Sequence, residues 1–236
     1  MRPLFILDWD DSLRRGYSAL AWVDFLYQEG LYDEKIYQDY RADFKRYKET
    51  RDYETFVNNY AKRYALALKG RPLRQILDRA KRFVRGEQTH LSAYTLELLS
   101  YCTSHEIDLM VISGSPRVVI DEFFQNYPLV KTHALEPALD AQEVYTGEIV
   151  KLNGGREFRR NILDQYREQR EVIMTIGDSP SDRYLLQNAD LAFLVGNKIE
   201  VETRPGLLRV THDTAAEVLI GFIEANLSGR TNVLVT

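Results

Sequence analysis

The sequence predicts an α/β fold, with a doubly wound parallel sheet (a Rossmann-like core) and an inserted α-helical domain. Short apolar runs that end in small or polar residues are typical of buried parallel strands. Four such runs occur, at residues 4–7, 109–112, 172–176 and 191–195. Helical patterns separate the later runs, and a long stretch without strand-like alternation separates the first two. Strands that alternate with helices in this way form a doubly wound sheet.

Helices are expected between the later strands. One covers residues 115–127 and has Pro116 in its first turn, a favoured position for proline. A second spans residues 157–170 with apolar side chains along one face, and a third opens at Ser179. Because an open α/β sheet binds its ligands at the carboxyl ends of the strands, the polar residues that end the apolar runs are the candidates for function.

The stretch between the first two strands predicts a separate helical unit. Amphipathic patterns indicate helices at residues 17–27, 33–47, 53–68 and 72–84, and a crossover helix at residues 91–102 returns the chain to the sheet. We therefore assign residues 1–13 and 89–236 to the core and residues 14–88 to an inserted helical cap.

The composition is that of a globular protein able to bury a sizeable core. The chain has 236 residues, of which 44% are hydrophobic and 28% are charged. Its net charge of −4 argues against a general nucleic-acid binder. We expect a monomer or homodimer whose partner is a small molecule.

Two further features favour a cytoplasmic protein. No apolar run approaches the roughly 18 residues that a membrane-spanning helix requires, and the apolar start of the chain is too short for a secretory signal. Cys102 is the only cysteine, which excludes a disulfide within the chain and fits a reducing compartment. We expect no membrane association.

Asp8 and Asp10 follow the first predicted strand directly. The first carboxylate can attack phosphorus and form an aspartyl phosphate. The second can protonate the leaving oxygen and later deprotonate the water that hydrolyses the intermediate. The alternative is an acidic turn that caps a helix beginning near Ser12.

The second and third strands also end in polar residues. Ser113 and Gly114 lie at a strand end beside the start of a helix, where a hydroxyl and a flexible backbone suit a phosphate oxygen. Asp178 and Asp182 follow the next strand, and Asp178 with Asp8 and a main-chain carbonyl predicts a hard oxygen site of the kind that magnesium prefers. The alternative for the second and third strand ends is helix capping, by Ser115 or by either aspartate.

Taken together, these motifs resemble the haloacid dehalogenase-like superfamily, whose four motifs are Asp-x-Asp, Ser or Thr, Lys, and Gly-Asp-x3-Asp. The resemblance covers most of the chain and is strongest to the phosphoserine-phosphatase-like branch, in which a helical cap lies between the first two motifs. The resemblance implies roles for individual residues. They are Asp8 as nucleophile, Asp10 as general acid/base and as a metal ligand through its main-chain carbonyl, Ser113 with Gly114 at the phosphate, Asp178 as a Mg²⁺ ligand and Asp182 in support of the metal shell.

The third motif departs from the family pattern. The sequence has Asn153-Gly154-Gly155-Arg156 where related sequences have Gly-Lys before the last catalytic strand. Arg156 therefore stands where the lysine is expected, and Lys151 is the other candidate. Either cation could neutralise the nucleophile and the phosphate, although the planar guanidinium is not equivalent to an ammonium.

The resemblance also bears on the substrate. Phosphoserine-specific relatives have a glutamate about nine residues after the nucleophile, and Tyr17 occupies that position here. We therefore expect a Mg²⁺-dependent phosphatase for a small phosphorylated metabolite other than phosphoserine, with Tyr17 near the substrate. The alternatives are a catalytically weak binding or scaffold protein, favoured only by the altered third motif, and a phosphotransferase or phosphomutase.

Overall fold

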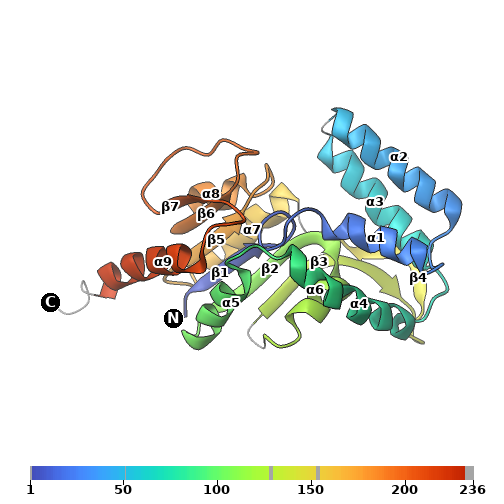
Figure 1. Cartoon of the computed structure of the whole chain (residues 1–236), viewed down its shortest axis with the longest axis horizontal. Helices are drawn as coiled ribbons and strands as arrows, with labels where there is room; N and C mark the ends of the chain where they lie inside the picture. The colour runs from blue at the N-terminus through green and yellow to red at the C-terminus, as the bar shows by residue number, and fades with distance from the viewer. Residues whose placement is uncertain (1, 51, 128–129, 153–154, 232–236) are drawn as a thin grey trace.

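The computed structural model describes residues 2–50, 52–127, 130–152 and 155–231. Its centre is a sheet of seven strands in the order β4-β3-β2-β1-β5-β6-β7 (Figure 1). All neighbouring strands are parallel except β3 and β4. The doubly wound α/β core predicted from the sequence is therefore confirmed.

The four predicted apolar runs form the middle of this sheet. They correspond to β1 (Leu4–Asp8), β2 (Asp108–Pro116), β5 (Ile173–Gly177) and β6 (Leu191–Val195). Three further strands extend the sheet at its edges: β3 (Val130–Leu139), β4 (Tyr145–Lys151) and β7 (Leu207–Val210). These three strands mix buried and exposed residues, so they lack the continuous apolar runs that marked the central strands.

Helices cover both faces of the sheet. One face carries α5 (Thr95–Ser104), α6 (Arg117–Phe124) and α9 (Ala216–Thr231), and the other carries α7 (Arg156–Arg167) and α8 (Arg183–Asn188). Pro116 ends β2 and caps α6, one position before the first turn in which we expected it. Phe5 and Val111 pack on the first face, whereas Ile6 and Ile112 pack on the second. This alternation fixes the side of the sheet on which each strand-end residue emerges.

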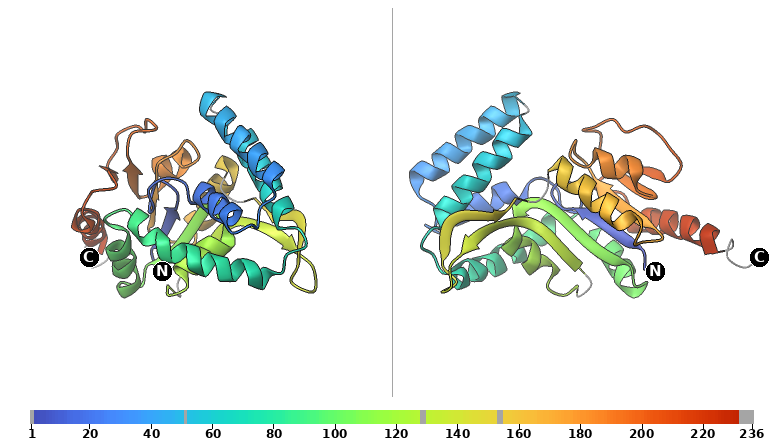
Figure 2. Two further views of the ribbon diagram at one scale, coloured as in Figure 1. Left: turned by 45° about the vertical axis from the view of Figure 1, so that its right-hand side comes forward. Right: turned by 180° about the vertical axis from the view of Figure 1, so that it is seen from behind.

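The predicted cap helices are present over nearly the expected ranges. They are α1 (Ser18–Gln28), α2 (Glu34–Thr50), α3 (Tyr53–Leu68) and α4 (Leu73–Glu87), and a short 3₁₀ turn, η1 (Gln88–His90), follows them. Among the described residues, no helix combines the length and the apolar composition that a membrane crossing requires. Figure 2 shows α2 and α3 standing over β3 and β4.

The cap shares its hydrophobic core with the sheet. Trp22 and Ile76 of the cap lie in one buried cluster with Val119, Leu135 and Tyr145 of the core elements. The loop between α3 and α4 also pairs with the start of β4. In that pairing the Gly70 amide donates to the Tyr145 carbonyl at 2.8 Å, and the Tyr145 amide donates to the Arg71 carbonyl at 2.9 Å. The cap is therefore attached to the core well away from its two linkers.

The two linkers that join the cap to the core, residues 9–17 and 88–94, pair with each other. The Arg15 amide donates to the His90 carbonyl at 2.7 Å, and the Ser92 amide donates to the Leu13 carbonyl at 2.9 Å. Arg14 and Glu87 form a salt bridge across the linkers, and both side chains are buried, at 3% and 6% exposure. Removing one partner of a buried ion pair destabilises a protein far more than replacing both partners, because the remaining charge is left buried without compensation.

We predict that Arg14→Met lowers the free energy of unfolding by about 3–5 kcal/mol, because it leaves the Glu87 carboxylate buried without its cation. The double variant Arg14→Met/Glu87→Met should recover part of this loss. Arg15→Met is the control, because its ion pair with Asp213 is exposed and contributes less than about 1 kcal/mol. Chemical denaturation measures all three. A cost for Arg14→Met no larger than that of Arg15→Met would contradict this account.

Candidate active site

Three strands bring the predicted catalytic residues to one edge of the sheet. β1 lies between β2 and β5, and Asp8 at the end of β1 pairs in register with Ile112 of β2. Leu7 pairs with Ile176 of β5. Ser113 and Asp178 therefore leave their strands beside Asp8, as the parallel strand order requires.

Three carboxylates converge at this edge. Oxygens of Asp8, Asp178 and Asp182 all lie within 4.8 Å of one another, and the three residues are 6%, 3% and 0% exposed. Burial, followed by the charge of Asp182, raises the pKa of Asp8 well above its usual range. Burial and the same neighbour raise the pKa of Asp178 to about 7. The site therefore favours any cation that relieves this repulsion.

Arg159 supplies one such cation. Its Nη2 donates to Asp8 Oδ1 at 2.7 Å, and its Nη1 lies 2.7 Å from Asp182 Oδ1. Nη2 also donates to the Ile112 carbonyl at 3.1 Å. The guanidinium, 3% exposed, thus links the predicted nucleophile to the fourth motif. The planar guanidinium contacts the two carboxylates through two different nitrogens, whereas an ammonium has only one nitrogen.

Arg159 is neither of the two cations, Arg156 and Lys151, that the sequence analysis named for this role. Arg156 is the exposed first residue of α7, and Lys151 is the exposed last residue of β4. Neither contacts Asp8 among the described interactions. Asn153 and Gly154, which begin the third motif, lie outside the described residues.

A helical pattern would have identified Arg159. The buried residues of α7 are Arg159, Ile162 and Leu163, which lie three and four positions apart and so share one face. A cation on the apolar face of a helix needs a buried partner. Arg159 was not named in the sequence analysis because the family pattern places the cation directly after Gly155, at Arg156.

Asp10 lies beside the carboxylate cluster but is held separately. Its Oδ1 accepts from the Ser18 amide at 2.6 Å, and its Oδ2 accepts from Ser115 Oγ at 2.5 Å. Burial raises the pKa of Asp10, and these hydrogen bonds limit the rise. We expect Asp10 to contact a metal through its main-chain carbonyl, which takes no part in these side-chain hydrogen bonds.

The predicted phosphate-binding residues lie next to Asp8. Ser113 is 2% exposed, and its Oγ accepts from the Ser115 amide at 3.0 Å. Gly114 follows it within β2. On the other side of Asp8, Ser12 Oγ donates to Asp8 Oδ2 at 2.9 Å. The Asp8 carboxylate is therefore oriented by a hydroxyl on one oxygen and by a guanidinium on the other.

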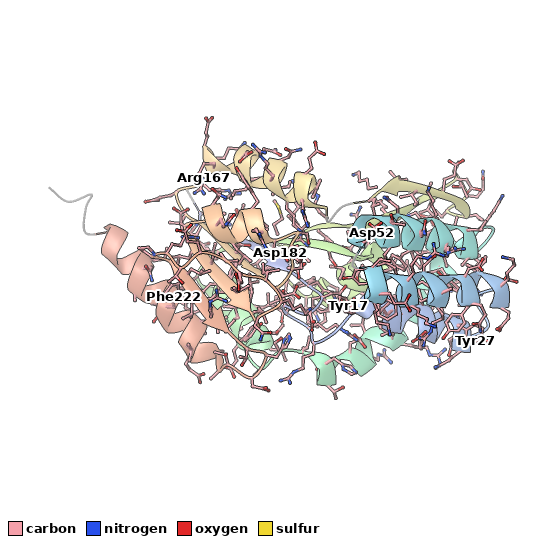
Figure 3. The ribbon with its side chains drawn as sticks, turned by 90° about the horizontal axis from the view of Figure 1, so that it is seen from above. Tyr17, Tyr27, Asp52, Arg167, Asp182 and Phe222 are labelled. Carbon is pink, nitrogen blue, oxygen red and sulfur yellow. The ribbon has the colours of Figure 1, made fainter. Side chains whose placement is uncertain are left out.

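Lys198 is a site residue that the sequence analysis missed. Its Nζ lies 2.5 Å from Asp178 Oδ2, contacts Asp11 and lies 3.5 Å from the Tyr17 hydroxyl. Although burial opposes it, the charges of Asp178 and Asp11 raise the pKa of Lys198. Figure 3 shows Tyr17 between the cap helices and the core. Lys198 follows β6 in a loop, and no motif or periodicity marked it.

The donor set suits a divalent cation. Asp8 and Asp178 each present a buried carboxylate oxygen, and oxygen ligands of this kind are those that magnesium takes. All three carboxylates also contact other side chains. Asp8 contacts Ser12 and Arg159, Asp178 contacts Lys198, and Asp182 contacts Arg159 and Ser179. A bound cation would therefore share its carboxylate ligands with these groups.

The chain belongs to the haloacid dehalogenase-like hydrolases. A model of that family matches residues 5–187, which include all four motif regions. This confirms the resemblance seen in the sequence. No curated protein sequence matches the chain significantly.

Several solved structures share the fold. A probable phosphoserine phosphatase from Vibrio cholerae has 15% identity and a TM-score of 0.67, over 98% of this chain and 67% of its own. Phosphoserine phosphatase from T. onnurineus has 19% identity and a TM-score of 0.58, over 95% of both chains. Cytosolic 5′-nucleotidase IIIB, bound to cytidine, has 14% identity and a TM-score of 0.65, over 98% of this chain and 88% of its own. At these identities the likeness establishes the fold alone.

We predict that Arg159→Met lowers kcat/KM for a phosphate ester by about 100-fold or more, the effect of removing a donor that stabilises developing negative charge. Arg159→Lys should restore only part, because the single nitrogen of lysine replaces the two guanidinium nitrogens that contact Asp8 and Asp182. Arg156→Met and Lys151→Met are matched controls and should stay within about threefold of wild type. Steady-state kinetics would reject the assignment if Arg156→Met caused the larger loss.

We also predict that the metal-free protein loses stability as the pH rises from about 5 to 7. The pKa of Asp178 is about 7 in the folded protein and near 3.8 when unperturbed, so the folded state binds the proton more tightly. The stabilisation is complete below pH 4 and is lost as the pH approaches 7. Asp178→Asn should flatten this slope in melting curves recorded with chelator.

The difference between wild type and Asp178→Asn reports the Asp178 carboxyl together with its effect on Asp8, whose pKa Asp178 also raises. Magnesium should raise the melting temperature of the wild type more at pH 7.5 than at pH 5, because protons no longer compete for the carboxylates. Identical pH slopes in the two proteins would refute the assignment.

Proposed function

We propose that this protein is a Mg²⁺-dependent phosphatase that hydrolyses a small phosphate monoester through an aspartyl phosphate on Asp8. The observation that carries the proposal is the setting of Asp8. Its buried carboxylate lies at a strand end between Ser12 and Arg159, with the Asp178 carboxylate beside it. Membership of a hydrolase family and the phosphatase folds among its structural neighbours support the same reaction class.

The chemistry follows from the side chains in place. An oxygen of Asp8 attacks phosphorus, the bond from phosphorus to the ester oxygen breaks, and Asp10 gives its proton to the departing alcohol. Water then attacks phosphorus, Asp10 takes the proton, and phosphate leaves with regeneration of Asp8. The raised pKa of Asp10 suits this role, because an acid must be protonated when the alcohol departs.

Arg159 and Ser113 are proposed to contact the phosphoryl oxygens. Arg159 already neutralises part of the charge of Asp8, which would otherwise repel the incoming phosphate. When bound by Asp8 and Asp178, a magnesium ion would supply further charge neutralisation for the phosphate. Gly177 leaves room for Asp182, since a Cβ at this position would lie 2.6 Å from the Asp182 side chain. The close packing keeps Asp182 against Arg159.

The substrate is proposed to be a small phosphorylated metabolite. Tyr17 provides a phenol where phosphoserine-specific relatives have a glutamate, and its hydroxyl lies near the Lys198 ammonium. A substrate amine would find no carboxylate at Tyr17 itself. This arrangement disfavours phosphoserine, and it supports a leaving group that does not carry an ammonium ion.

The two alternatives are a catalytically weak scaffold protein and an enzyme that transfers the phosphoryl group to another alcohol. The scaffold hypothesis depended on an altered third motif, and the contact of Arg159 with Asp8 removes the reason for it. A phosphotransferase or phosphomutase would use the same aspartyl phosphate but pass the group to another alcohol. Release of inorganic phosphate without any acceptor separates a phosphatase from both.

We predict magnesium-dependent release of phosphate from a generic aryl phosphate. Chelator should abolish it, and Asp8→Asn should lower the rate by about 1,000-fold or more, because the nucleophile is lost. Asp164→Asn, an exposed position on α7, is the matched control and should keep wild-type activity. If the folded wild type released no phosphate from the aryl ester or from a panel of metabolite esters, the proposal would fail.

A further inference from the structure

A cavity of about 400 Å³ lies beside β3, outside the catalytic edge of the sheet. Its lining includes three cationic side chains, two carboxylates and one imidazole. They are Arg117, Lys131, Lys151, Asp121, Glu136 and His133. β2 separates this cavity from β1, because Ile112 pairs with Asp8 on one side and with His133 on the other. Two strand spacings place the Cα atoms of Asp8 and His133 about 10 Å apart.

The carboxylates of this cavity are already engaged. Arg117 donates from Nε to Asp121 Oδ2 and from Nη1 to Glu136 Oε2, each at 3.0 Å. Lys131 donates to the Tyr166 hydroxyl at 3.0 Å, so the partner in this contact is a hydroxyl and not a carboxylate. Lys151, on β4, is the cross-strand neighbour of Glu136. Three cations against two carboxylates leave the wall with a net positive charge.

His133 shares the cavity wall with all three cations. Burial lowers the pKa of His133, and the charges of Lys131, Lys151 and Arg117 all lower it further. Its Nε2 is buried and has no hydrogen-bond partner among the described residues. The ring packs against Phe158 of α7, with 5.2 Å between the ring centroids. A buried polar atom without a partner calls for an explanation, and a ligand supplies one.

We propose that this cavity binds a small phosphate-bearing anion at Lys131, Lys151 and His133. Phosphate oxygens accept charge-assisted hydrogen bonds from ammonium groups, and the imidazole can add a further donor. The volume exceeds what one phosphate needs, so a phosphorylated metabolite also fits the chemistry. The site is separate from the proposed catalytic centre and does not depend on the proposed reaction.

Titration with inorganic phosphate, followed by the ring NMR signal of His133, tests the proposal. The chain has four histidines, so the loss of one signal in His133→Gln assigns it. We expect a saturable shift beyond that caused by chloride at matched ionic strength. Lys131→Gln and Lys151→Gln should each weaken binding about fivefold or more, whereas Lys81→Gln, at an exposed position of α4, should not change it.

The titration repeated in Asp8→Asn and in chelator separates the two sites. Persistence of the His133 shift there supports a separate anion site. The proposal is overturned if the shift disappears in Asp8→Asn, if no saturable shift occurs, or if both lysine variants retain the wild-type midpoint. The signals of the other three histidines check that each variant is folded.

Discussion

The constraint on which the site depends is the burial of three like charges at one end of a parallel sheet. Asp8, Asp178 and Asp182 are almost inaccessible, and their oxygens lie within 4.8 Å of one another. Such a cluster is unfavourable unless cations or protons compensate it. Arg159 from α7 and Lys198 from the loop after β6 provide two cations from separate elements. Further positive charge, such as that of a metal ion, would therefore stabilise this end of the sheet, where the phosphoryl group of the substrate is proposed to bind.

The cap is built into this arrangement rather than hinged freely above it. Its buried cluster includes Leu135 and Tyr145 of the β3–β4 pair, and its two linkers are joined by the Arg14–Glu87 pair. The first linker also carries Asp10, whose carboxylate is fixed by the Ser18 amide at the start of α1. A displacement of α1 would therefore move the group proposed to protonate the leaving alcohol. Asp10 is thus held from the cap by Ser18 and from the core by Ser115.

Local sequence patterns predicted the four central strands and the cap helices. The four central strands are continuous apolar runs because both faces are buried, and the cap helices show amphipathic periods, so both were recognised. β3, β4 and β7 were not predicted as strands, because their residues are partly exposed and show no continuous apolar run. Asp8, Asp10, Ser113 and Asp178 were grouped because they follow apolar strands, and the family resemblance implied their roles. Arg159 could have been recognised from the helical spacing of the buried residues in α7, whereas Lys198 lies in a loop that no local pattern marks.

The proposed reaction requires that phosphorus becomes covalently attached to Asp8. Rapid mixing of enzyme, magnesium and aryl phosphate, followed by borohydride quenching and peptide mass spectrometry, detects this bond. Borohydride reduces an acyl phosphate to an alcohol, so we expect homoserine at position 8 in the trapped enzyme and unchanged Asp10 and Asp178. Phosphate release at the full rate with no modified residue at position 8, or with the modification at another aspartate, would contradict it.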